Sequence, residues 1–231
     1  MELVVANLDD LRAEITHAFE RRAAAGPINC GLAGGPTALI YLAALREAQV
    51  DWSQVTFFMA DERTGVSESG ESHADVARRM LGPVREGRGP RLFAMNGSWT
   101  DLKAAAAEYD YVLGRELHDE PLDLAILGVG EDGHVAGLFA GHPALEELTR
   151  VAAIDNAPRA PFRRLTMTMS FLISTPEIWI VALGERKRAI VQAAATRTTA
   201  DSPFDMLLRH AGNVTIFTDQ LVQRSNPVRA R

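Results

Sequence analysis

An acid and a histidine two residues apart, Asp132 and His134, follow directly on an apolar run of the chain. The run covers residues 122–127 and ends in a Gly-Val-Gly turn, as is typical of a buried parallel strand. Ligands of open α/β sheets lie just beyond the carboxyl ends of such strands. Near neutral pH a histidine can act as a general base, and a neighbouring carboxylate can orient its ring. The pair therefore predicts acid–base chemistry, with an ordinary polar turn as the alternative.

The loop that contains Gly34, Gly35 and Thr37 connects a strand-like segment, Ile28–Leu32, to a helical pattern. Glycines let backbone N–H groups approach an anion, and the start of a helix supplies partial positive charge. The threonine hydroxyl can donate a further hydrogen bond. The loop therefore predicts a phosphate site, although a tight turn with a helix cap would use the same residues. It is not a Walker loop, because no Gly-Lys-Ser/Thr follows.

Charged residues stand at two other expected strand ends. An Asp-Glu-Arg triplet, residues 61–63, follows the strand-like segment Val55–Met59, and three adjacent charges there must face solvent or a polar cleft. Lys187, one of only two lysines among 24 basic side chains, follows another apolar segment. We expect these charges to lie at the same sheet edge as His134. A solvated strand end and a surface lysine are the alternatives.

Residues 128–133, GVGEDG, also match the dinucleotide-binding pattern GxGxxG. Asp155 comes 22 residues later, behind the strand-like segment Val151–Ile154, where a ribose-binding acid would stand. However, two acidic residues inside the motif would repel a pyrophosphate, and residues 141–143, Gly-His-Pro, interrupt the helix that should follow. The acid–histidine interpretation is therefore preferred.

The elements that must position these groups alternate between helical and strand-like patterns along nearly the whole chain. The other strand-like segments are residues 164–169, 178–183 and 213–218, and a polar loop is expected over residues 64–71. Helical patterns cover residues 11–19, 39–45, 74–81, 99–117 (begun at Thr100 or Asp101) and 184–195. We predict one α/β domain, residues 1–231, with a mostly parallel, Rossmann-like sheet flanked by helices on both faces.

Composition narrows the class of protein. A chain of 231 residues with 47% hydrophobic side chains can bury a core, and no apolar run reaches the ~20 residues of a membrane span. The net charge of −6 argues against a broad nucleic-acid surface. The start of the chain lacks the pattern of a signal peptide, so we expect a cytoplasmic protein. The single cysteine, Cys30, excludes an internal disulfide and a metal site built on thiolates.

Taken in order, these segments resemble the 6-phosphogluconolactonases of the glucosamine-6-phosphate isomerase/deaminase superfamily. Residues 31–37, GLAGGPT, resemble the family's GLSGGST loop, and residues 58–63, FMADER, are similar to its strand that ends in DER. Residues 127–145 resemble the family segment LGMGPDGHTASLFPGHPAL. The resemblance extends over roughly residues 28–218. Further segments resemble the family in the same order along the chain, namely Ser72-His73 and residues 157–161, 164–168 and 184–187.

The resemblance implies a lactonase of the pentose phosphate route that acts on 6-phosphogluconolactone without metal or cofactor, as a monomer or weak homodimer. By this match His134 would be the general base toward water, Asp132 would orient its ring, and Arg63 would bind or polarise the substrate. The substrate and its 6-phosphate would be held by Gly34, Gly35, Thr37, Asp61, Arg159 and Lys187.

A deaminase of the same superfamily is the first alternative. Glu131 is similar to the deaminase version of the loop, but deaminases carry a second acid at the position of Phe139 and tend to have an aromatic residue at that of Arg63. Ring opening and isomerisation need that extra proton shuttle, which phenylalanine cannot provide. The resemblance therefore favours the lactonase.

A phosphosugar-binding protein with little catalysis is the second alternative. Ala33 and Pro36 replace two serines of the family's phosphate loop, and His73 replaces an asparagine. Near the end of the chain, Asp205 stands in a segment without the family's small-residue pattern, and we expect it to add negative charge close to the site.

Overall fold

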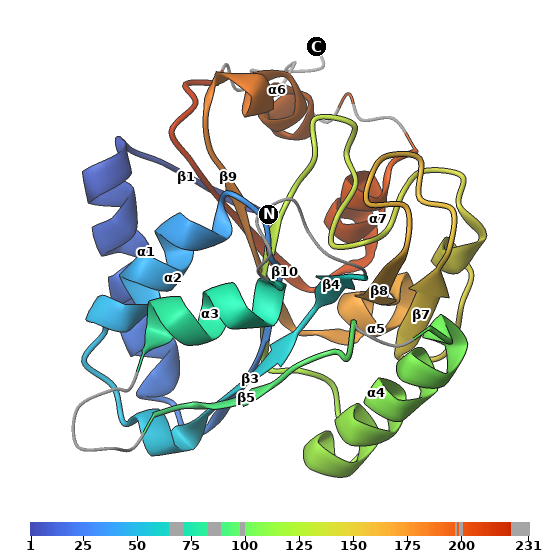
Figure 1. Cartoon of the computed structure of the whole chain (residues 1–231). Helices are drawn as coiled ribbons and strands as arrows, with labels where there is room; N and C mark the ends of the chain where they lie inside the picture. The colour runs from blue at the N-terminus through green and yellow to red at the C-terminus, as the bar shows by residue number, and fades with distance from the viewer. Residues whose placement is uncertain (65–71, 83–88, 98–99, 197, 199–200, 223–231) are drawn as a thin grey trace.

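Seven strands form the main sheet of the computed structural model, which describes residues 1–64, 72–82, 89–97, 100–196, 198 and 201–222 (Figure 1). Their order is β1-β10-β9-β6-β2-β3-β5, and every neighbouring pair is parallel. In chain order the strands are β1 (Glu2–Val5), β2 (Ile28–Leu32), β3 (Val55–Met59), β5 (Arg91–Phe93), β6 (Leu124–Gly128), β9 (Glu177–Ala182) and β10 (Asn213–Thr218). The predicted α/β fold with a mostly parallel sheet is confirmed.

A second, smaller sheet was not predicted. It has the order β4-β8-β7 and is antiparallel, with β4 at Asp61–Arg63, β8 at Arg164–Met167 and β7 at Val151–Ile154. The charged triplet that the sequence placed at the end of β3 is therefore a strand of its own, and it pairs with a segment a hundred residues further along the chain.

Helices cover both faces of the main sheet. Their bounds are α1 (Leu8–Ala23), α2 (Ala38–Glu47), α3 (His73–Leu81), α4 (Leu102–Leu117), α5 (Met169–Ser174), α6 (Arg188–Thr196) and α7 (Pro203–His210). In Figure 1, α1, α2 and α3 lie on one side of the sheet, and α4, α5 and α7 lie on the other with the small sheet. No helix in the described ranges is long and apolar enough to cross a membrane.

Local sequence explains where the helices begin. The side chain of Asn7 accepts hydrogen bonds from two N–H groups of the first turn of α1, and Leu11, Ile15 and Phe19, spaced four apart, are fully buried. Asp101 caps α4 in the same way, as predicted. The predicted start of that helical pattern at residue 99 and most of the loop 64–71 lie outside the described residues.

Two predicted segments each contain two elements in the structure. The strand-like run 164–169 ends at Met167, because Thr168 caps α5 by accepting a hydrogen bond from the N–H of Phe171. The helical pattern 184–195 is divided into a 3₁₀ turn, Glu185–Lys187, and α6. The elements β1, β5, α5 and α7 had no counterpart among the predicted elements.

Candidate active site

The strand order brings four loops together. Strands β9, β6, β2 and β3 are neighbours in the main sheet, so the segments that follow their carboxyl ends meet at one edge. A cavity of about 240 Å³ lies there. Its wall contains all but one of the predicted site residues, namely Gly34, Gly35, Thr37, Asp61, Arg63, His134, Arg159 and Lys187. The remaining one, Asp132, contacts His134 and Arg159 directly.

The predicted acid–histidine pair is formed. Nδ1 of His134 lies 2.5 Å from Oδ1 of Asp132, and the imidazole stacks on Phe139 with the ring centroids 4.8 Å apart. Oδ2 of Asp132 lies 2.8 Å from Nη2 of Arg159. Nε2 of His134 has no hydrogen-bond partner within the described part of the chain, and the ring belongs to the cavity wall. The ring is therefore fixed through one nitrogen, with the other left for a ligand or water.

Glycine at position 130 makes this pair possible. A Cβ there would lie 1.9 Å from Nδ1 of His134 and 2.4 Å from Oδ1 of Asp132. The N–H of Gly130 donates to the carbonyl of His134 at 2.8 Å and closes the loop. No helix follows, since Val135 pairs with Val129 and Leu138 in β-bridges. The dinucleotide interpretation of this loop is therefore wrong, and its second glycine, Gly130, makes room for the acid–histidine pair.

The protonation states of the pair suit a general base. Burial lowers the pKa of His134 below its ordinary value, an effect that Asp132 opposes and that Arg159 and Arg164 reinforce. Burial alone would raise the pKa of Asp132, but the hydrogen bond with His134 and the charge of Arg159 hold it below its ordinary value. At neutral pH the carboxyl is therefore ionised and the imidazole can accept a proton.

Among the described residues, four arginine and lysine side chains line the cavity: Arg63, Arg159, Arg164 and Lys187. Arg63 and Arg164 lie directly opposite each other on β4 and β8. Burial lowers the pKa of Lys187 and also that of Arg164, whose ordinary value lies so high that it stays charged. In a chain of net charge −6, this local excess of positive charge predicts an anionic ligand.

Arg164 is a site residue that was not among the predicted ones, because it begins an otherwise apolar run and the family resemblance of residues 164–168 assigned it no role. Its Nε donates to the carbonyl of Pro161 at 3.0 Å, and its guanidinium lies 5.1 Å from the centre of the Phe139 ring. The side chain thus holds the segment that carries Arg159 against the ring on which His134 stacks.

Gly34 contributes in a different way from the predicted one. Its N–H donates to Oδ1 of Asp61 at 3.1 Å, so this donor is occupied within the protein. A Cβ at Gly34 would lie 2.0 Å from the ring of His73, so the glycine also makes room for that ring. Thr37 precedes α2 and makes no capping hydrogen bond with its side chain, which leaves its hydroxyl for a ligand.

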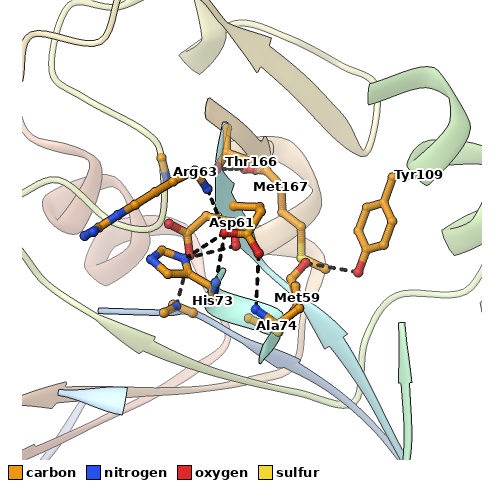
Figure 2. A network of polar contacts seen from close by, with 12 residues as sticks. Met59, Asp61, Arg63, His73, Ala74, Tyr109, Thr166 and Met167 are labelled. Carbon is orange, nitrogen blue, oxygen red and sulfur yellow. Dashed lines mark hydrogen bonds and ion pairs between the residues drawn. The ribbon is translucent and has the colours of Figure 1, made fainter. Parts of the chain in front are cut away.

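A buried network supports the wall at Asp61 (Figure 2). Nδ1 of His73 lies 3.5 Å from Oδ1 of Asp61, and the carboxylate of Glu62 accepts the N–H groups of His73 and Ala74 at 3.0 and 3.1 Å. Burial alone would lower the pKa of His73, but Asp61 and Glu62 raise it above its ordinary value. The Asp-Glu-Arg strand is therefore anchored to the start of α3 by its own carboxylates.

Asp205 is not among the residues that line the cavity, and its carboxylate has a structural role. The carboxylate is buried at the start of α7, where one oxygen accepts the N–H and Oγ–H of Ser202. Ser202 in turn packs on Gly133 of the His134 loop, where a Cβ would meet it at 2.6 Å. Asp205 thus forms a capping box with Ser202, and Ser202 packs against the loop that contains His134.

Comparisons with known proteins show the family of the chain. The family model described as glucosamine-6-phosphate isomerases/6-phosphogluconolactonase matches residues 2–216. The 6-phosphogluconolactonase of Mycobacterium tuberculosis is 33% identical over 201 residues, which cover 83% of this chain and 81% of that protein. The 6-phosphogluconolactonase of Streptomyces coelicolor is 32% identical over 215 residues, covering 84% and 82%.

Solved structures support the fold. A 6-phosphogluconolactonase from Thermotoga maritima matches with a TM-score of 0.77 and 24% identity over 95% of this chain and 97% of its own. A monomeric glucosamine-6-phosphate deaminase matches with a TM-score of 0.76 and 20% identity over 94% and 97%. Both activities therefore occur on this fold. The chain belongs to the family of glucosamine-6-phosphate isomerases and 6-phosphogluconolactonases.

Proposed function

We propose that this chain hydrolyses 6-phosphoglucono-1,5-lactone to 6-phosphogluconate, a step of the pentose phosphate route. The observation that carries the proposal is the His134–Asp132 pair, held 2.5 Å apart at the wall of a cavity with four cations. The relatives over 30% identical that are cited above are named 6-phosphogluconolactonases, which supports the same substrate.

The residues suggest the following steps. Nε2 of His134 takes a proton from a water molecule as the water oxygen forms a bond to the lactone carbonyl carbon. The carbonyl electrons move onto its oxygen, and Arg63 stabilises the resulting negative charge. When the carbonyl reforms, the bond to the ring oxygen breaks, and that oxygen takes the proton from the imidazolium. The acid product then ionises. A general base placed in this way contributes about 10²–10⁴-fold.

Phosphate recognition falls to Lys187, Arg159 and the loop at Thr37. Charge-assisted hydrogen bonds from these groups would hold the far end of the substrate, which places the ester near His134. No metal or cofactor takes part in the proposed steps, since water, one imidazole and fixed cations suffice for an already electrophilic ester.

The position of Phe139 weighs against deaminase activity. Its ring packs against His134 and under Arg164, where a deaminase of this superfamily would need a carboxyl group for the additional proton transfers. The apolar ring instead contributes to the burial that keeps the imidazole neutral.

The test is to follow lactone hydrolysis by coupling the product to 6-phosphogluconate dehydrogenase, against the spontaneous rate. Clear acceleration supports the proposal. Tight binding of 6-phosphogluconate without acceleration would instead indicate a phosphosugar-binding protein. Release of ammonia from glucosamine 6-phosphate would indicate a deaminase.

A further inference from the structure

The carboxylate that orients the base is shared between two partners. Asp132 contacts Nδ1 of His134 through Oδ1 at 2.5 Å and Nη2 of Arg159 through Oδ2 at 2.8 Å. Arg159 is also the cation that the proposed function assigns to the substrate phosphate. A phosphate dianion that approaches Nη2 of Arg159 would compete with the Asp132 carboxylate for it, because the dianion carries the larger negative charge.

The ion pair between Arg159 and Asp132 is exposed to solvent and therefore weak. The side chains of Arg159 and Asp132 are 53% and 36% exposed, and pairs as exposed as this contribute little free energy. The backbone of the segment is held more firmly, because Arg164 donates to the carbonyl of Pro161 at 3.0 Å and to that of Arg159 at 3.4 Å. The guanidinium of Arg159 can therefore change partner while its backbone stays at the cavity wall.

We propose that a phosphate group bound in the cavity takes Arg159 from Asp132, so that the phosphate of the substrate promotes the general-base step as well as binding. This inference rests on the proposed function. Arg159 is then a positioning residue for the base and a contact for the phosphate, and it couples the two ends of the substrate.

The charges around His134 give the direction of the effect. Asp132 raises the pKa of the imidazole, whereas Arg159 and Arg164 lower it. When Arg159 moves to a phosphate dianion, its positive charge is neutralised and Asp132 acts on His134 alone, so the imidazole becomes a stronger base. The other charged groups of the same cavity wall, Asp61, Arg63, His73 and Lys187, are present with and without this exchange.

The exchange would make the rate of hydrolysis depend on whether the sugar lactone carries a phosphate group. An unphosphorylated sugar lactone can enter the cavity but offers no dianion, so Arg159 stays on Asp132 and the base stays weak. Free inorganic phosphate, bound beside such a lactone, should then restore part of the missing activity.

The first test is an NMR titration of the His134 Cε1–H signal, assigned by its loss in His134→Ala, with and without inorganic phosphate. In the wild type we expect phosphate to raise the titration midpoint of His134. In Arg159→Met we expect a midpoint already raised without phosphate, and loss of the further rise. Arg186→Met is the matched control, because Arg186 is 86% exposed and lies 3.7 Å from Glu131 rather than on Asp132. It should respond to phosphate as the wild type does.

The second test measures hydrolysis of unphosphorylated gluconolactone with and without inorganic phosphate. We expect a several-fold activation in the wild type and in Arg186→Met that is lost in Arg159→Met. An equal rise of the His134 midpoint in the wild type and Arg159→Met, or equal activation in both, would overturn the exchange. A protein that hydrolyses no lactone refutes the proposed function instead, and the NMR titration still decides the exchange.

Discussion

Gly130 offers the sharpest structural perturbation of the catalytic pair. In Gly130→Ala the new methyl group would lie 1.9 Å from Nδ1 of His134 and 2.4 Å from Oδ1 of Asp132. Non-bonded heavy atoms of this kind rest at about 3.5 Å, so the imidazole must retreat by roughly 1.5 Å or the loop must open. Either movement breaks the 2.5 Å contact between the ring and the carboxylate.

The size of the effect follows from this displacement. A misplacement of about 1 Å at a reacting group can cost about 10²-fold in rate, and the whole contribution of a general base is about 10²–10⁴-fold. We therefore expect kcat of Gly130→Ala to fall by about 10² or more. The KM for the phosphorylated lactone should change much less, because the cations that hold the phosphate lie on other segments.

The assay is steady-state lactone hydrolysis, with thermal unfolding measured in parallel. Gly128→Ala is the control, at the end of the strand that precedes the loop. A Cβ at Gly128 would meet no heavy atom of the described part of the chain within 4 Å, and because Gly128 also lines the cavity, the comparison is made on kcat and not on KM. Gly128→Ala should retain most of its kcat. A Gly130→Ala protein that is folded and keeps wild-type kcat would refute the idea that this loop exists to hold the pair.

Three further predictions follow from the same structure. Lys187→Ala should raise KM for the phosphorylated lactone with kcat less affected, since the phosphate contact is similar in ground and transition states; an unaltered KM removes Lys187 from the site. Because burial lowers the pKa of His134, the acid limb of kcat/KM against pH should lie below the ordinary histidine value of about 6.5. A limb above that value would contradict the assigned environment. Asp205→Ala removes the capping box of α7 and should cost about 1–2 kcal/mol of unfolding free energy, visible as a lower Tm; an unchanged Tm would show that the cap is dispensable.

Much of the fold could be predicted from local patterns. The bounds predicted for Ile28–Leu32, Val55–Met59 and Asn213–Thr218 are those of the structure, because a glycine or a polar residue stands within two positions beyond both ends of each segment. The short strand β5 and the edge strand β1 were missed, since partly exposed strands of three or four residues carry little pattern.

The second sheet shows what local patterns cannot give. Asp61–Arg63 is a strand only because it pairs with Arg164–Met167. The residues around either segment contain no signal that predicts this pairing. The same pairing brings Arg164 into the cavity wall, which is why that residue was not among the predicted site residues. The pattern of residues 164–169 predicts a single strand, because a short apolar run does not reveal that Thr168 caps a helix.

The site residues were easier to predict than their interactions. Motif matches indicated His134, Asp132 and Arg159, and the structure brings them together. That Arg159 contacts Asp132, and that the N–H of Gly34 is taken by Asp61, depends on side-chain geometry that spacing along the chain does not encode.

The most direct measurement of the central claim compares wild type with His134→Ala in lactone hydrolysis and in calorimetric binding of 6-phosphogluconate. We expect kcat of the variant to fall by about 10²–10⁴-fold while 6-phosphogluconate still binds, because the phosphate contacts remain. A variant that hydrolyses the lactone at the wild-type rate would show that the imidazole is not the base.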